Sequence, residues 1–182
     1  MTWDGDEYQA RFDALAASGV DVHGEAAFVL TLEPRPVSVL DAGCGTGRGG
    51  IELARHRVTV VGVDVDRAML AAARRAAPDA EWFEHDLATL DLGRSFDVVL
   101  MAGNVPLFTA PGTHRALVSG CARHVGPGGA LVAGFQLGRG YALDQYDAHC
   151  ADAGLVLAGR YATWDRATFA GGDYAVSVHR RA

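Results

Sequence analysis

The chain has 182 residues, of which 49% are hydrophobic and 21% charged, so it is long enough to bury a sizeable core and has no composition typical of disorder. Its formal net charge is −6 and its 16 basic residues are scattered, which argues against nucleic acid as a partner. Three cysteines without paired spacing, and the lack of an apolar run of membrane-spanning length, lead us to expect a cytoplasmic protein with no membrane partner. No metal site is expected, because no pair of the seven histidines has metal-ligand spacing with accompanying carboxylates.

Helical spacing begins near the N-terminus and is then replaced by alternating strands and helices. Residues 5–18 and 22–32 are expected to form two helices broken at "SGVD". From residue 37 onward, short β-branched runs alternate with Ala- and Leu-rich stretches, a pattern typical of a parallel sheet covered by helices on both faces. The expected strands cover 37–42, 58–64, 80–86, 96–102 and 129–135, and the expected helices cover 47–56, 66–77 and 112–125. Asp66 is placed to cap the second of these helices, and Thr113 lies near the start of the third.

The last part of the chain predicts a helix and a hairpin. Residues 142–154 have the pattern of a helix that Gly154 ends, and strands are expected at 155–164 and 173–181 around "AGGD". So short a connection joins antiparallel neighbours, since a parallel crossover needs far more chain. The prediction is therefore an α/β fold in three layers, with a mostly parallel, seven-stranded sheet and an antiparallel C-terminal hairpin strand. No linker divides the chain, so we expect one domain over residues 1–182.

Glycines are concentrated in the stretch "VLDAGCGTGRGG", which spans residues 39–50. A strand that ends near Asp41 and continues through Gly43, Gly45 and Gly47 into a helix can bring bare backbone N–H groups and a helix N-terminus against a ligand. A dinucleotide fingerprint would require glycine three positions after Gly45, but Arg48 stands there. The spacing is instead D-x-G-x-G-x-G.

This motif resembles motif I of the class I S-adenosylmethionine-dependent methyltransferases, and further positions at the ends of later strands match that family. These are Asp64, the "HDL" of residues 85–87, the "GNVPLF" of residues 103–108 and the "GPGG" of residues 126–129. The chain looks most similar to small bacterial members of the methyltransferase type 11 or 25 groups. The resemblance implies a Rossmann-like fold, an S-adenosylmethionine cofactor and methyl transfer to a small-molecule substrate by in-line displacement.

The resemblance also assigns roles to particular residues. Asp64 would accept the ribose hydroxyls, Asp86 would bind the adenine amino group, and apolar residues would flank the adenine ring. The positions expected at the cofactor are Gly43, Cys44, Gly45, Asp64, Val65, Asp86, Leu87, Gly103 and Asn104, together with Tyr8 and Arg11 of the N-terminal segment. Asp41 is expected to orient the glycine loop, with direct contact to the ligand left open. No catalytic base is identified from the residues, and the oligomeric state stays open.

Several alternatives are compatible with these residues. The chain could bind S-adenosylmethionine without catalysis, methylate a protein, or act as a nicotinamide-dependent oxidoreductase, although the loop spacing and the final hairpin disfavour the last. The stretch "NVPLF" resembles the N-P-P-Y/F motif of amino methyltransferases, but Val105 stands in place of a proline and no basic groove accompanies it, so nucleobase methylation is disfavoured. Cys44 has no neighbouring base and is expected to fill the turn.

Residues 1–34 are expected to form a lid over residues 35–182. The open end of the sheet needs a cover that excludes water, and no insertion after the fourth or fifth strand supplies one. Tyr8, Arg11 and Phe12 share a helical face and are expected to close over the cofactor. Arg139 and Tyr141 follow the fifth strand and are expected on the same rim, where they could meet a substrate.

Overall fold

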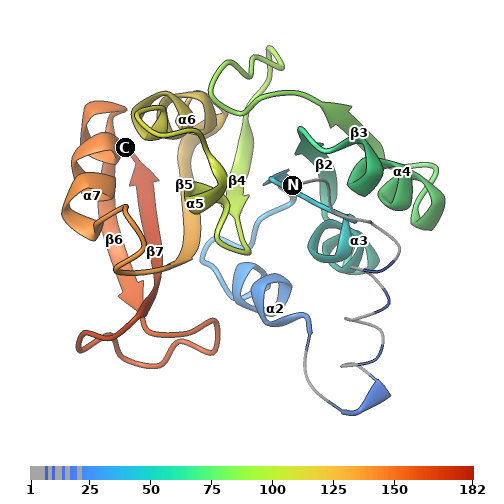
Figure 1. Cartoon of the computed structure of the whole chain (residues 1–182), viewed down its shortest axis with the longest axis horizontal. Coiled ribbons are helices and arrows are strands. Elements are labelled where there is room, and N and C mark those ends of the chain that lie inside the picture. The colour runs from blue at the N-terminus through green and yellow to red at the C-terminus, as the bar shows by residue number, and fades with distance from the viewer. Residues whose placement is uncertain (1–6, 8–9, 11–13, 15–16, 20–21) are drawn as a thin grey trace.

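A central sheet lies between two layers of helices in this computed structural model, which describes residues 22–182 together with residues 7, 10, 14 and 17–19 (Figure 1). The strands are β1 (Ser38–Ala42), β2 (Thr59–Asp64), β3 (Glu81–Glu84), β4 (Phe96–Met101), β5 (Val125–Gln136), β6 (Leu155–Tyr161) and β7 (Tyr174–Arg181). The helices are α2 (Gly24–Leu30), α3 (Arg48–Arg55), α4 (Arg67–Ala76), α5 (Val105–Phe108), α6 (His114–Ala122) and α7 (Leu143–Asp152). No described helix is long and apolar enough to cross a membrane.

The seven strands form one mixed sheet in the order β3-β2-β1-β4-β5-β7-β6. Strands β1 to β5 are parallel, and β7 pairs antiparallel with both β5 and β6. The predicted α/β class, the mostly parallel sheet and the antiparallel C-terminal strand are therefore confirmed. The strand order reverses between β1 and β4, where crevices at the carboxyl ends of parallel strands commonly receive ligands.

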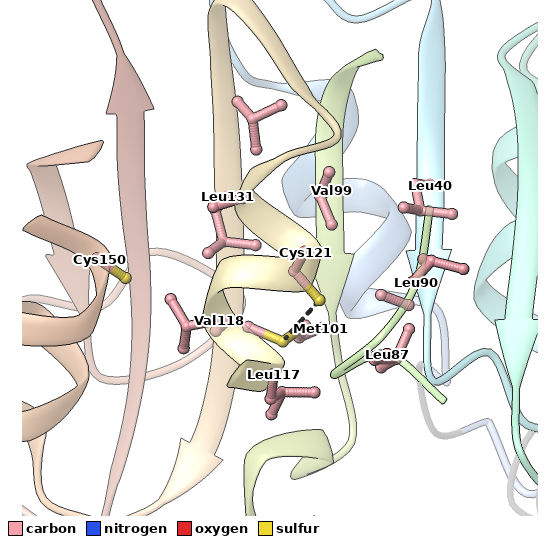
Figure 2. Packing of buried hydrophobic residues seen from close by; sticks show 14 of the residues in the cluster. Leu40, Leu87, Leu90, Val99, Met101, Leu117, Val118, Cys121, Leu131 and Cys150 are labelled. Carbon is pink, nitrogen blue, oxygen red and sulfur yellow. Dashed lines mark hydrogen bonds between the residues drawn. The ribbon is translucent and has the colours of Figure 1, made fainter. Parts of the chain in front are cut away.

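Alternate residues of the central strands enter two different cores, as the pleat of a strand requires. On β4, Val98 and Leu100 pack on the side of α2 and α3, whereas Val99 and Met101 pack on the side of α6 and α7. Figure 2 shows the second core: Cys121 of α6 faces Met101, and its thiol donates to the methionine sulfur at 3.7 Å. This packing fixes the two helix layers against the strands that carry the ligand-facing loops.

Two strand boundaries and one short helix differ most from the sequence prediction. Strand β5 begins at Val125 instead of residue 129, because the "GPGG" stretch continues the strand through a register shift opposite β4. Strand β6 ends at Tyr161, so the connection to β7 is the loop of residues 162–173 and not a short turn around "AGGD". The short helix α5 was not predicted; a turn this short has no apolar period to reveal it.

The predicted helix ends are partly confirmed. The carboxylate of Asp66 accepts hydrogen bonds from the N–H groups of Ala68 and Met69 at 2.8 and 3.2 Å and so caps α4. Thr113 precedes α6, but its hydroxyl donates to the Ala110 carbonyl and makes no cap bond. Helix α7 ends at Asp152, and Gly154 has a φ of 77°, a backbone conformation that suits glycine.

Close packing of α6 predicts an unusual response to a helix-favouring substitution. A Cβ atom at Gly120 would lie 1.9 Å from the carbonyl oxygen of Leu87, and a backbone atom cannot move aside cheaply. Gly120→Ala should therefore lower the free energy of unfolding by about 2 kcal/mol, despite the better helix propensity of alanine. Chemical denaturation would measure the change.

The matched control is Gly49→Ala in α3, where the nearest atom to the new Cβ is a carboxylate oxygen of Asp41 at 3.6 Å, an ordinary contact. That variant should be as stable as the wild type or slightly more stable. If both variants were equally stable, the close approach of α6 to Leu87 would not require glycine at position 120.

Candidate functional site

The glycine loop joins the end of β1 to the start of α3, as predicted. Gly43, Gly45 and Gly47 all have positive φ, at 81°, 55° and 78°. A side chain at any of the three would strain the backbone, because residues other than glycine rarely adopt this conformation. The sequence pattern thus encodes a loop that only glycine forms easily at three alternate positions.

Each of these glycines has a different neighbour. A Cβ at Gly43 would lie 2.4 Å from a methyl group of Val105, and one at Gly47 would lie 2.6 Å from the ring of Trp82. A Cβ at Gly45 would meet no atom of the described residues within 4 Å. Gly43 and Gly47 therefore allow protein packing, whereas Gly45 borders open space and is the position where a ligand can approach the backbone.

The backbone N–H groups of Gly43, Cys44 and Gly47 are engaged within the protein, which corrects the expectation of bare donors at these positions. Gly43 and Cys44 both donate to the carbonyl of Val63, at 2.8 and 3.0 Å, and Gly47 donates to the carbonyl of Cys44 at 2.9 Å. The sequence predicted the turn correctly but not its partners, because the acceptor Val63 belongs to the neighbouring strand.

Asp64 at the end of β2 connects two loops at the predicted site. One carboxylate oxygen accepts from the Gly45 N–H at 2.8 Å, and the other accepts from the Asp66 N–H at 2.9 Å. Each carboxylate oxygen has a second lone pair, so Asp64 can still accept hydrogen bonds from a ligand beside Gly45. Val65 follows with 64% of its surface exposed, so its apolar side chain is accessible at this end of the sheet.

The segment after β3 lies next to Asp64. The His85 N–H donates to the Asp64 carbonyl at 3.0 Å, and the exposed Asp86 accepts from the Ala88 N–H at 2.8 Å. Leu87 is only 6% exposed and lies among the leucines of the core (Figure 2). The side chain of Asp86 thus faces solvent at the end of the sheet, whereas that of Leu87 contributes to packing.

The segment after β4 lies on the other side of the glycine loop. Gly103 has a φ of 69° and open space where a Cβ would stand. Asn104 adopts a φ of 66°, and its side-chain oxygen accepts from the Gln136 N–H at 2.8 Å. Val105 then packs on Gly43. The amide oxygen of Asn104 therefore joins the ends of β4 and β5.

Asp41 lies beneath the loop and is only 4% exposed. It accepts a hydrogen bond at 3.0 Å from the N–H of Gly50, in the first turn of α3. Burial raises the pKa of Asp41 to about 7, an effect that outweighs this hydrogen bond and the nearby Arg48 guanidinium, which both lower it. The supporting role expected for Asp41 agrees with this position.

Two further expected residues are buried. Cys44 is 8% exposed, and burial raises the pKa of its thiol far above the usual range, which argues against a nucleophile. Tyr141 was expected on the rim, but it is 2% exposed, and its hydroxyl lies 2.7 Å from His149 Nδ1. Its ring stacks on His114 with centroids 4.1 Å apart, so Tyr141 packs in the core and is not exposed on the rim as expected. Arg139 is exposed, as expected.

The N-terminal segment was expected to supply Tyr8, Arg11 and Phe12, which lie outside the described residues. Helix α2 is described, and Glu25 on it forms an ion pair at 3.0 Å with Arg48, the first residue of α3. Both side chains are 16% exposed. This link between α2 and the glycine loop was missed, because residues 23 positions apart show no periodic signal.

Comparisons with known proteins agree with this geometry. The family model described as "Methyltransferase domain" matches residues 39–129. A solved TehB-like SAM-dependent methyltransferase from Corynebacterium glutamicum is 32% identical, covers 98% of each chain and superposes with a TM-score of 0.90.

Two curated relatives from Streptomyces match over shorter stretches. A dTDP-3-amino-3,6-dideoxy-alpha-D-glucopyranose N,N-dimethyltransferase of Streptomyces fradiae is 36% identical over 63% of this chain and 47% of its own length. A cypemycin N-terminal methyltransferase of a Streptomyces species is 40% identical over 51% of this chain and 39% of its own length. The chain therefore spans about half the length, or less, of these curated relatives.

The raised pKa of Asp41 predicts a pH-dependent stability. In the unfolded chain this carboxyl ionises near 3.8, whereas in the folded protein it ionises near 7. Its contribution is fully present below pH 4 and is lost as the pH rises to 7, since the unfolded chain releases its proton first. Between pH 5 and pH 8 the wild type should lose about 2 kcal/mol more unfolding free energy than Asp41→Asn, whose amide oxygen still accepts from Gly50.

Denaturant titration at the two pH values measures this difference. Asp79→Asn, at an exposed position, is the control and should follow the wild type. Identical pH dependence in the wild type and Asp41→Asn would mean that Asp41 is already ionised at pH 5.

Proposed function

The chain belongs to the class I S-adenosylmethionine-dependent methyltransferases, and on that premise we propose that it binds S-adenosylmethionine and transfers its methyl group to a small-molecule acceptor. The single observation that carries the proposal is the pairing of open space beside Gly45 with the Asp64 carboxylate that holds this loop. The proposal extends to the whole protein, although the match to the Streptomyces fradiae relative covers only 47% of that relative's length.

The described residues suit this cofactor. The space beside Gly45 and Gly103 can receive a chain that runs along the end of β1, and Asp64 retains lone pairs for ribose hydroxyls. Exposed Val65 offers an apolar surface to the adenine ring. We propose that these residues bind the cofactor together with Gly43, Cys44, Asp86, Leu87 and Asn104. For the buried Cys44 and Leu87, the contact would come from the main chain.

The protein contributes positioning to this reaction. When bound, the cofactor supplies an electrophilic methyl group on a sulfonium sulfur, and the acceptor's lone pair displaces the thioether. Asp64 and the glycine loop would fix one reactant, and the segment at Gly103 and Asn104 would line the place where the acceptor approaches. Holding two reactants in line is the larger part of catalysis here, because the leaving group is already activated.

The acceptor class is supported by the relatives. Those named above act, by their names, on an amino sugar and on the N-terminus of cypemycin, and a further relative from Azoarcus is a trans-aconitate 2-methyltransferase. We propose a small molecule as acceptor. The relative that methylates an N-terminus keeps protein methylation as the second candidate.

Domain organisation and location complete the proposal. We propose one methyltransferase domain over residues 1–182, with residues 1–34 as a lid on the core of residues 35–182. Tyr8 and Arg11 would then contact the cofactor from the lid. We also propose a bacterial, cytoplasmic protein that acts without nucleic acid or a membrane.

Removal of the Asp64 carboxylate tests the cofactor site. Asp64→Ala should weaken S-adenosylhomocysteine binding by about 2 to 3 kcal/mol, because the ribose would lose a charged acceptor and the Gly45 loop would lose its anchor. Calorimetric titration measures the change in affinity.

Asp97→Ala is the matched control. Asp97 also accepts hydrogen bonds from two backbone N–H groups, those of Val37 and Ser38, but at the opposite end of the sheet. It should destabilise the fold without changing the affinity for S-adenosylhomocysteine. Equal affinities in the wild type and Asp64→Ala would place the ribose elsewhere.

A further inference from the structure

An open cleft of about 300 Å³ lies against the loop that joins β6 to β7. It is lined by Thr163, Trp164, Asp173 and Tyr174, together with glycines of the same loop. The loop lies at the same end of the sheet as the cofactor site: Tyr174 begins β7 opposite Gln136, the last residue of β5. In Figure 1 this loop extends beside α2, below the sheet.

Direct contacts connect the cleft to the segment after β4. Asn104 donates its N–H to the carbonyl of Gly134 at 3.3 Å. A Cβ at Gly134 would lie 2.3 Å from the Trp164 ring and 2.6 Å from the Tyr174 hydroxyl. Gly134 is therefore the residue that allows the aromatic wall of the cleft to lie directly beside the proposed methyl-transfer position.

The sheet order separates this cleft from the proposed cofactor residues. Gly45, Asp64 and Asp86 lie at or just after the ends of β1, β2 and β3, whereas the cleft lies at the ends of β5, β6 and β7. The β4 segment stands between the two halves, at the point where the strand order reverses. Two reactants that meet there would approach from opposite sides.

The lining combines flat aromatic surface with one carboxylate. The Trp164 indole N–H donates to the Tyr174 hydroxyl at 3.0 Å, and Phe28 of α2 packs edge-on against the indole ring with centroids 5.5 Å apart. These contacts fix the orientation of the ring that borders the cleft. A rigid aromatic face can bind either a sugar-like ring or a cation.

The carboxylate of Asp173 provides the charge. Its main-chain carbonyl is held by the N–H of Leu137 at 2.7 Å, while its side chain is exposed and forms no ion pair within the described part of the chain. No basic residue of the described chain lines the cleft. The cleft is thus suited to a positively charged ligand.

The loop is anchored away from the cleft. The Arg166 side chain donates to the hydroxyl and the carbonyl of Thr31, both at 3.1 Å, and its guanidinium lies 4.8 Å from the centre of the Phe28 ring. Arg166 is therefore engaged by α2 and does not neutralise Asp173 in the cleft. Helix α2 supports both this loop and, through Glu25, the glycine loop.

We propose that this cleft binds the methyl acceptor and selects small polar rings that carry a protonated amino group, with Asp173 pairing with the charge and Trp164 contacting the ring. The inference rests on the proposed methyl transfer and adds the chemical class of its acceptor. Neutral compounds of the same shape lack the ion pair and bind more weakly.

The test uses D-glucosamine as a cationic probe and N-acetyl-D-glucosamine as its neutral counterpart. The full chain, saturated with S-adenosylhomocysteine, is titrated with each sugar while the indole N–H signals are followed by NMR. Trp164→Phe identifies the Trp164 signal. D-glucosamine should shift that signal, and N-acetyl-D-glucosamine should leave it nearly unchanged. Asp173→Asn should weaken D-glucosamine binding about fivefold, the scale of an exposed ion pair.

The control is Asp79→Asn, at an exposed position before β3, which should bind the probe as the wild type does. Equal responses to both sugars, no response to either, or unchanged affinity in Asp173→Asn would overturn the inference. Affinity for S-adenosylhomocysteine is measured separately on each variant. If the wild type did not bind S-adenosylhomocysteine, the proposed function itself would be wrong. The failure of the proposed function and the failure of the acceptor inference are therefore distinguishable.

Discussion

The carboxylate of Asp64 is the interaction on which the proposed site depends. Its two oxygens accept hydrogen bonds from the N–H groups of Gly45 and Asp66, so one side chain fixes both the loop after β1 and the start of α4. Ionic acceptors make stronger hydrogen bonds than neutral ones, and both donors lie in turns that have no ladder partner of their own. The open space beside Gly45 keeps its shape because Asp64 holds its border.

The surrounding elements support this border from two sides. Val105 and Trp82 pack on Gly43 and Gly47, and buried Asp41 accepts from the first turn of α3 beneath the loop. Helix α2 then joins the glycine loop, through Glu25 and Arg48, to the β6–β7 loop, through Phe28 and Arg166. One short helix therefore positions both the proposed cofactor side and the proposed acceptor side of the site.

The sequence predicted those features that depend on residues close together in the chain. Alternating runs located β1 to β4, and the spacing of Gly43, Gly45 and Gly47 predicted a glycine loop between the first strand and a helix, where the structure has positive φ at all three. Contacts between distant residues were missed: Val63 as acceptor for the loop, the ion pair of Glu25 and Arg48, and the burial of Tyr141 against His114. The start of the loop of residues 162–173 was predicted wrongly. The strand was expected to continue to residue 164 because "LVLAGRYATW" stays largely apolar, but β6 ends at Tyr161.

The most direct test of the account is calorimetric titration of the wild-type chain with S-adenosylhomocysteine and, separately, with NADH. The account predicts a dissociation constant in the range of micromolar for S-adenosylhomocysteine, about −8 kcal/mol, and no binding heat with NADH. Tight binding of NADH together with no heat from S-adenosylhomocysteine would contradict it, because the D-x-G-x-G-x-G loop and Asp64 would then serve a dinucleotide.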